Sequence, residues 1–137
     1  MSLGVVFAAI GQHFVEEAIV SAASIKERNA RELAVTLFTD QTVNSPYFDQ
    51  IVRVEKGFDN PSLERVRLLG MSPYGMTLSL DTDTYIVDPI DEIFELGHHF
   101  DFTAAHAPGR ITGTAPGISS AFPEFNGGVL LFGSSLP

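Results

Sequence analysis

The sequence of 137 residues contains no cysteine and no tryptophan, and basic residues are scarce. Without cysteine, the chain can form no disulfide, no zinc–thiolate site and no thiol nucleophile. Eight Lys and Arg stand against 17 Asp and Glu, which gives a formal net charge of −9. Because nucleic-acid binding needs clustered basic side chains, we expect no nucleic-acid partner.

The chain also lacks a long apolar run. The apolar stretch at 5–10 is too short to cross a bilayer, and it lacks the basic flank of a signal peptide. We therefore expect no transmembrane segment and a cytoplasmic location. Hydrophobic residues nevertheless make up 45 % of the chain, which is enough for the core of one compact domain of this length.

Apolar, β-branched segments alternate with segments of helical periodicity. The first two apolar segments lack a polar face, which is typical of strands in a parallel sheet covered on both sides. The pattern predicts an α/β fold, a three-layer α/β/α sandwich with a mostly parallel sheet. Strands are predicted at 4–11, 33–40, 51–56, 76–83, 100–108 and 126–133, and helices at 12–29, 60–70 and 88–97.

Two predicted helices carry clear boundary residues. The helix at 60–70 has Asn60 as its N-cap and Gly70 as its stop, with proline at the first helical position. In the helix at 88–97, Asp88 is expected to be the cap and Pro89 the first residue. The Gly/Ser/Pro-rich stretch at 109–125 is too long for a simple connection and is expected to be a mobile or functional loop.

An acidic pair stands at the end of the predicted strand at 76–83. Asp81 and Asp83 are separated by one threonine, so their carboxylates repel each other unless a cation lies nearby. Binding sites in α/β folds lie at the carboxyl ends of strands. Asp81 and Asp83 lie at such an end, as do Gly11 and Asp40.

Two simple interpretations of the pair involve turns. Each aspartate could cap the following turn, although this does not explain why two are needed. A calcium loop of the EF-hand type would use Asp81, Asp83 and Glu92 at positions one, three and twelve. However, Ile86 stands where that loop needs glycine, and a strand rather than a helix precedes it.

A phosphatase is a third interpretation. The stretch SLDTDTYI at 79–86 resembles the first motif of haloacid-dehalogenase-like phosphatases, in which the first aspartate attacks phosphorus. That chemistry also needs a lysine downstream, whereas the last lysine here is Lys56. A fourth interpretation is a divalent cation held by both carboxylates, which lets an acidic chain bind a diphosphate.

Three stretches together resemble the GT-A fold glycosyltransferases: TLSLDTDTYI at 77–86, FDFTAAH at 100–106 and PEFNGGVLLF at 123–132. The resemblance covers most of the chain and is closest to the glycogenin and bacterial galactosyltransferase-like group with its D-x-D motif. It implies transfer of a hexose from UDP-sugar, or a similar donor, to an unknown acceptor. It also implies Mn²⁺ or Mg²⁺ as the cofactor.

The resemblance assigns roles by position. Asp81 would meet the ribose and the metal, and Asp83 would ligate the metal. Arg65 or Arg67 would contact the phosphates or the sugar of the donor. The remaining residues implied to contact the nucleotide or sugar are Ala8, Ala9, Ile10, Gly11, His13, Asp40, Asn126, Gly127 and Gly128.

Each of these residues also has a simpler interpretation. Arg65 and Arg67 face different directions on a helix, so one of them is expected to be a solvated charge. Asn126, Gly127 and Gly128 could form a turn or bulge at a strand start. His13 could simply be a polar residue of the first helical turn.

The chain departs from the family in its length. Family members run on beyond this point and supply a histidine as a third metal ligand, whereas this chain stops at Pro137. We expect residues 1–137 to be a single nucleotide-sugar-binding domain and a fragment of a longer protein. A non-catalytic nucleotide-binding or assembly domain is the alternative. In a chain truncated here, the edge of the sheet would be exposed, which favours a homodimer.

Overall fold

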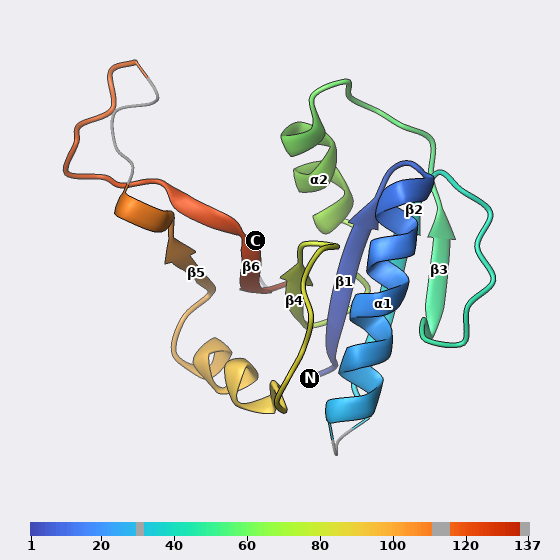
Figure 1. The fold of residues 1–137 in the computed structure, drawn as a ribbon. Coiled ribbons are helices and arrows are strands. Elements are labelled where there is room, and N and C mark those ends of the chain that lie inside the picture. Colours follow the sequence, from blue (N-terminus) through green and yellow to red (C-terminus); the bar gives the residue numbers. More distant parts are fainter. Residues whose placement is uncertain (30–31, 111–115, 135–137) are drawn as a thin grey trace.

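The structure is a computed structural model that describes residues 1–29, 32–110 and 116–134 (Figure 1). Its elements follow one another in the order predicted from the sequence. In chain order they are β1 (Leu3–Ala9), α1 (Gln12–Arg28), β2 (Ala34–Thr39), β3 (Gln50–Arg53), α2 (Pro61–Leu69), β4 (Met76–Leu80), the 3₁₀ helix η1 (Asp91–His98), β5 (Phe102–His106), the 3₁₀ turn η2 (Pro108–Arg110) and β6 (Phe125–Gly133).

The strands form one sheet in the order β3-β2-β1-β4-β6-β5. The pairs β2–β3, β1–β2 and β1–β4 are parallel, whereas β6 runs antiparallel to both β4 and β5. The sheet is therefore mixed, with its parallel part at one side. Strands β2 and β4 flank β1, so the strand order reverses there and leaves a crevice at the carboxyl ends of β1 and β4.

Alternating side chains of β1 face two separate cores. Val5 and Phe7 belong to a core that α1 covers, and Val6 belongs to a second core that α2 covers through Leu68. Phe94 of η1 extends the first core below β4. These two cores on opposite faces of one sheet make the three layers of the predicted α/β/α architecture, which is confirmed (Figure 1).

Helix α2 begins as its sequence predicts. The side-chain oxygen of Asn60 accepts hydrogen bonds from the backbone N–H groups of Ser62 (2.9 Å) and Leu63 (3.1 Å), and Pro61 is the first helical residue. Gly70 is the C-cap. The helix therefore has a fixed start, which sets the direction in which its side chains point.

The predicted start of the last helix is wrong. The helical segment is the 3₁₀ helix η1, which begins at Asp91, and Asp88 does not cap it. The backbone N–H of Ile90 instead donates to the side chain of Asn29 at the end of α1 (2.8 Å). This bond holds the preceding residues as a loop along α1, where the N–H of Ile86 donates to Ser24 (2.9 Å).

Two further expectations concern the rest of the chain. The predicted mobile or functional loop at 109–125 includes residues 111–115, which lie outside the described residues.

Strands β3 and β5 form the edges of the sheet, and a homodimer through an edge stays a prediction. Within the described ranges, no helix combines the length and the apolar character needed to cross a membrane.

The core formed by β4 and α1 gives a direct test of the fold. Leu78 of β4 is fully buried in it, so Leu78→Ala should lower the free energy of unfolding by about 2–5 kcal/mol. Leu63 of α2 is 54 % exposed, so Leu63→Ala should change the free energy of unfolding by about 0.5 kcal/mol or less. Urea unfolding of both variants measures the difference, and equal losses would contradict the assignment of Leu78 to the core.

Candidate functional site

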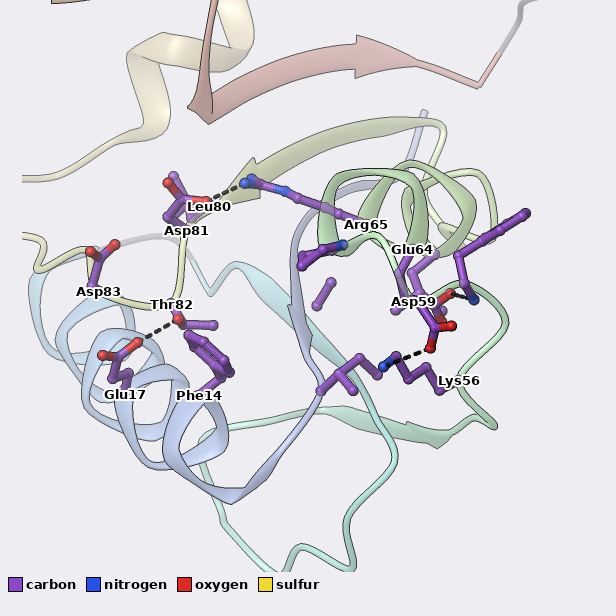
Figure 2. Close-up of a pocket in the computed structure, with 15 residues that line it drawn as sticks. Phe14, Glu17, Lys56, Asp59, Glu64, Arg65, Leu80, Asp81, Thr82 and Asp83 are labelled. Carbon is purple, nitrogen blue, oxygen red and sulfur yellow. Dashed lines mark hydrogen bonds and ion pairs between the residues drawn. The ribbon is translucent and has the colours of Figure 1, made fainter.

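A pocket of about 490 Å³ opens at the carboxyl ends of β1 and β4, and we call it the switch-point pocket (Figure 2). Strand ends supply one side of it, α1 a second and α2 with the segment before it a third. Its lining combines apolar side chains with charged ones. The lining residues are Ala8, Ile10, Phe14, Glu17, Lys56, Phe58, Asp59, Pro61, Glu64, Arg65, Leu68, Leu80, Asp81, Thr82 and Asp83.

Asp81 lies between the sheet and α2. Its backbone N–H donates to the carbonyl of Gly128 (2.8 Å), which continues the β4–β6 pairing by one step. Its carboxylate forms an ion pair with Arg65 (Figure 2). The guanidinium of Arg65 also donates to the hydroxyl of Ser79 (3.1 Å). Ser79 and Asp81 both meet α2 because alternate residues of an extended chain share a face.

The next two residues point away from α2. The hydroxyl of Thr82 donates to Glu17 of α1 (2.6 Å), and Glu17 also lies 3.1 Å from the imidazole of His13. Asp83 is exposed beside them (Figure 2). Its carboxylate makes no hydrogen bond or ion pair with the part of the chain that the structure describes. Thr82 therefore separates a paired carboxylate from an open one.

Strand β6 brings the predicted Asn-Gly-Gly stretch to Asp81. Because β6 is antiparallel to β4, its first residues lie beside the last residues of β4. A Cβ atom on Gly128 would lie 2.7 Å from Oδ2 of Asp81 and 2.9 Å from Oδ1 of Asn126, whereas one on Gly127 would meet nothing closer than Arg65 at 4.0 Å. Only glycine at 128 therefore leaves room for the Asp81 carboxylate.

The stretch after β1 divides between the pocket and the core. Ala8 and Ile10 line the pocket, whereas the side chain of Ala9 is fully buried in the core under α1. Gly11 has a backbone φ of 98°, a conformation that favours glycine, and it turns the chain into α1. His13 stands outside the pocket lining with 77 % of its side chain exposed.

Asp40 fixes this turn rather than lining the pocket. Its carboxylate accepts hydrogen bonds from the side chain of Gln41 and from the N–H of Gly11, both at 2.9 Å. These two bonds, that from Gln41 first, hold the pKa of Asp40 below its ordinary value. Asp40 also borders a second hollow with Arg53 and Lys56.

Arg65 and Arg67 point in different directions, as expected. Arg67 lies outside the pocket lining and pairs with Glu64, and it also donates to the carbonyl of Glu55 (2.9 Å). Glu64 is only 3 % exposed, although it is charged. Its carboxylate accepts from the N–H groups of Gly57 (3.0 Å) and Phe58 (2.8 Å).

These contacts explain the ionisation of Glu64. The hydrogen bond from Arg67 is the largest cause, and the two backbone bonds add to it, so the pKa of Glu64 falls from 4.5 to about 2 against the opposing effect of burial. The ionised carboxylate thus holds residues 55–58 against α2. That segment includes Lys56 and Phe58, which line one wall of the pocket.

Several pocket residues were missed from the sequence. The pairing of Glu64 with Arg67 follows a helical i, i+3 spacing, which was a usable signal. No local pattern reveals Glu17, because its partner Thr82 is 65 positions away. Lys56 and Asp59 form an exposed ion pair (3.4 Å) in a stretch without periodicity.

The carboxylates at 81 and 83 fit a hard divalent cation in part. Both offer oxygen ligands at a pocket rim, and Asp83 is free to use both of its oxygens. Across residues 1–29, 32–110 and 116–134, no three His, Asp or Glu side chains group closely enough to hold a metal ion. Magnesium sites often use one or two carboxylates together with waters and substrate phosphates. Two carboxylates are therefore sufficient for an ion that the phosphates of a substrate also hold.

Solved glycosyltransferases have the same fold as this chain. The galactosyltransferase LgtC in complex with donor and acceptor sugar analogues has a TM-score of 0.69 at 18 % identity over 96 % of this chain. An active-site mutant of LgtC has a TM-score of 0.69 at 16 % identity over 96 % of this chain. The glycosyltransferase GlyE from Streptococcus pneumoniae TIGR4 has a TM-score of 0.66 at 20 % identity over 98 % of this chain.

These similarities establish the GT-A fold, as the resemblance predicted. The chain spans only part of each solved structure: 58 % and 57 % of the two LgtC chains and 34 % of GlyE. No protein-family model and no curated protein matches the sequence.

The buried carboxylate of Glu64 predicts a pH-dependent stability. Since its folded pKa of about 2 lies below the ordinary 4.5, its ionised form stabilises the fold above about pH 4.5, and this stabilisation is lost as the pH falls toward 2. Glu64→Gln should therefore lower Tm at pH 7, and the difference from the parent protein should shrink below pH 4.5.

Thermal unfolding followed by circular dichroism between pH 2.5 and 7 measures this difference. Glu27→Gln is the matched control, because Glu27 is 65 % exposed and its only ion pair within the described residues, with Arg28, spans 3.9 Å. The control should leave Tm nearly unchanged across the range. A Glu64→Gln loss that is equal at pH 3 and pH 7 would contradict the assigned pKa.

Proposed function

We propose that this chain is the donor-binding part of a metal-dependent glycosyltransferase that moves a hexose from a UDP-sugar, or a similar nucleotide donor, to an acceptor. The observation that carries the proposal is the convergence at one rim of Asp81, Asp83 and Arg65, with Gly128 leaving room beside them. The GT-A fold of the chain supports it as well.

The charges of the pocket suit a diphosphate only with a cation. Five acidic residues line the pocket against two basic ones, Lys56 and Arg65, among the described residues. Asp81 and Asp83 would hold Mn²⁺ or Mg²⁺ together with the two phosphates of the donor. The bound ion would act as a Lewis acid that stabilises negative charge on the leaving diphosphate.

The chain's own residues would orient the rest of the donor. Arg65 is within reach of the same rim and would pair with a phosphate or a sugar hydroxyl. Ala8 and Ile10, together with Phe14 from the first turn of α1, offer an apolar surface that suits the nucleoside end. Asn126 lies near the start of β6 and would face the sugar, with Gly127 and Gly128 leaving room.

The other proposed contacts act at a distance from the pocket. Gly11, held by Asp40, would keep the backbone after β1 in place, and Ala9 would do so from the core. His13 lies outside the lining but in the same first turn of α1 as Phe14, from where it would cover a bound nucleotide. Arg67 would act through Glu64 on the wall at 55–58.

A non-catalytic nucleotide-binding domain is a second candidate. It is favoured by the absence of a third protein ligand within the described residues, which makes any metal dependent on the nucleotide. Both candidates predict binding of a nucleoside diphosphate with a metal. Only hydrolysis or transfer of a UDP-sugar, lost in Asp83→Ala, would identify the enzyme.

The first prediction for this site concerns ligand stabilisation. UDP with Mn²⁺ should raise the free energy of unfolding by about 2.7 kcal/mol when free ligand exceeds its Kd a hundredfold. Asp83→Asn keeps the size of the side chain but removes a charged ligand, so it should abolish most of that gain. Thermal shift with UDP, Mn²⁺ and both together measures it.

Asp88→Asn is the matched control, since Asp88 is exposed and lies outside the pocket lining. The control should retain the full shift. Stabilisation by fluoroberyllate with Mg²⁺ but not by UDP would favour a phosphatase instead, and no shift with either ligand would refute the proposed binding site.

The two adjacent glycines of β6 give a second prediction. Gly128→Ala places a methyl group against Oδ2 of Asp81, so the carboxylate must move, and Mn²⁺–UDP affinity should fall about 10–100-fold. Gly127→Ala has room for the methyl group and should leave affinity within about twofold. Isothermal titration of both variants measures the contrast; equal losses would show that Asp81 does not act through this rim.

A further inference from the structure

Arg65 already occupies the place of a cation in the free protein. Its guanidinium is held at two points, by the ion pair with Asp81 and by the hydroxyl of Ser79 at 3.1 Å. Its side chain is 24 % exposed and that of Asp81 is 44 % exposed, so both are at the surface of the pocket (Figure 2). Arg65 therefore neutralises one of the two carboxylates of the acidic pair, that of Asp81.

We propose that Arg65 is an internal counter-cation that must leave Asp81 before the site can be loaded, so that a divalent metal and a nucleoside diphosphate bind cooperatively through its change of partner. The inference rests on the proposed function. It goes further, because it states how the free site is kept neutral and how its two ligands depend on each other.

Each ligand alone meets a penalty in this arrangement. A divalent cation alone must share Asp81 with a guanidinium, and the two positive charges repel each other at that carboxylate. A diphosphate alone must draw Arg65 away, which leaves the Asp81 carboxylate unpaired and facing an anion. With both ligands present, the cation lies with Asp81 and Asp83 and the guanidinium lies with a phosphate, so every charge has a partner.

The surroundings allow this exchange. Asp83 has no protein partner among the described residues, so the pair keeps one carboxylate ready for a cation. Gly127 leaves 4.0 Å between its added-Cβ position and Nη1 of Arg65, so the guanidinium has space on the β6 side. Arg67, by contrast, is fixed by Glu64 and by the carbonyl of Glu55 and cannot replace Arg65.

The prediction is that removing the Arg65 charge changes the two affinities in opposite directions. In Arg65→Met, the affinity for Mn²⁺ alone should rise about fivefold or more, because the competing cation is gone. The affinity for UDP in the presence of Mn²⁺ should fall, because the phosphate loses its partner. Arg65→Lys should lie between the parent protein and Arg65→Met in both affinities.

The experiment uses the full chain. Free Mn²⁺ is followed by electron paramagnetic resonance during titration, first without UDP and then with saturating UDP. Isothermal titration at saturating Mn²⁺ measures the affinity for UDP, and circular dichroism verifies the fold of each variant. Arg53→Met is the matched control: Arg53 is the last residue of β3, outside the switch-point pocket, and its only side-chain hydrogen bond among the described residues is to Thr42 (3.3 Å). This control loses the same charge and should leave both affinities nearly unchanged.

The outcomes separate the two proposals. The parent protein could bind Mn²⁺ with UDP while Arg65→Met binds Mn²⁺ alone no more tightly than the parent does. That result would refute the counter-cation role of Arg65 and leave the proposed donor site intact. A rise in Arg53→Met equal to that in Arg65→Met would also refute it, since only net charge would then matter. If the parent protein binds no Mn²⁺ even with saturating UDP, the proposed function itself fails.

Discussion

The ion pair between Arg65 and Asp81 joins the two halves of the site. Arg65 comes from α2, on one face of the sheet, and Asp81 comes from the end of the fully buried strand β4. The pair can form only because the capped start of α2 and the pairing of β4 with β1 are both fixed. It also answers the electrostatic problem of two aspartates placed so close together, since a guanidinium neutralises one of them.

The rest of the site is arranged around that carboxylate by elements with no shared sequence signal. Strand β6 supplies Gly128, whose missing side chain leaves space for Oδ2 of Asp81. Helix α1 supplies Glu17, which holds Thr82 and so turns the chain between the two aspartates. Glu64 fixes the opposite wall from a buried position, where its charge is tolerated because three donors surround it.

The shared fold and the local chemistry of the pocket support different conclusions. TM-scores of 0.66–0.69 at 16–20 % identity establish the architecture, because backbone topology persists when sequence has diverged. A fold alone does not assign an activity, and the function proposed here therefore depends on the charges at one pocket rim. The scarcity of basic residues makes that rim informative, since paired carboxylates repel a diphosphate unless a cation lies between them.

The sequence by itself determined the elements and the position of the acidic pair. Apolar runs defined β1, β2 and β4, and Asn60 with Pro61 defined the start of α2, because these signals act over a few residues. It could not determine where η1 begins, because Asn29, far away in the chain, holds Ile90. Only the tertiary structure decided that β6 runs antiparallel to β4 and that Arg65 rather than Arg67 meets Asp81, because both depend on contacts between segments that no local pattern encodes.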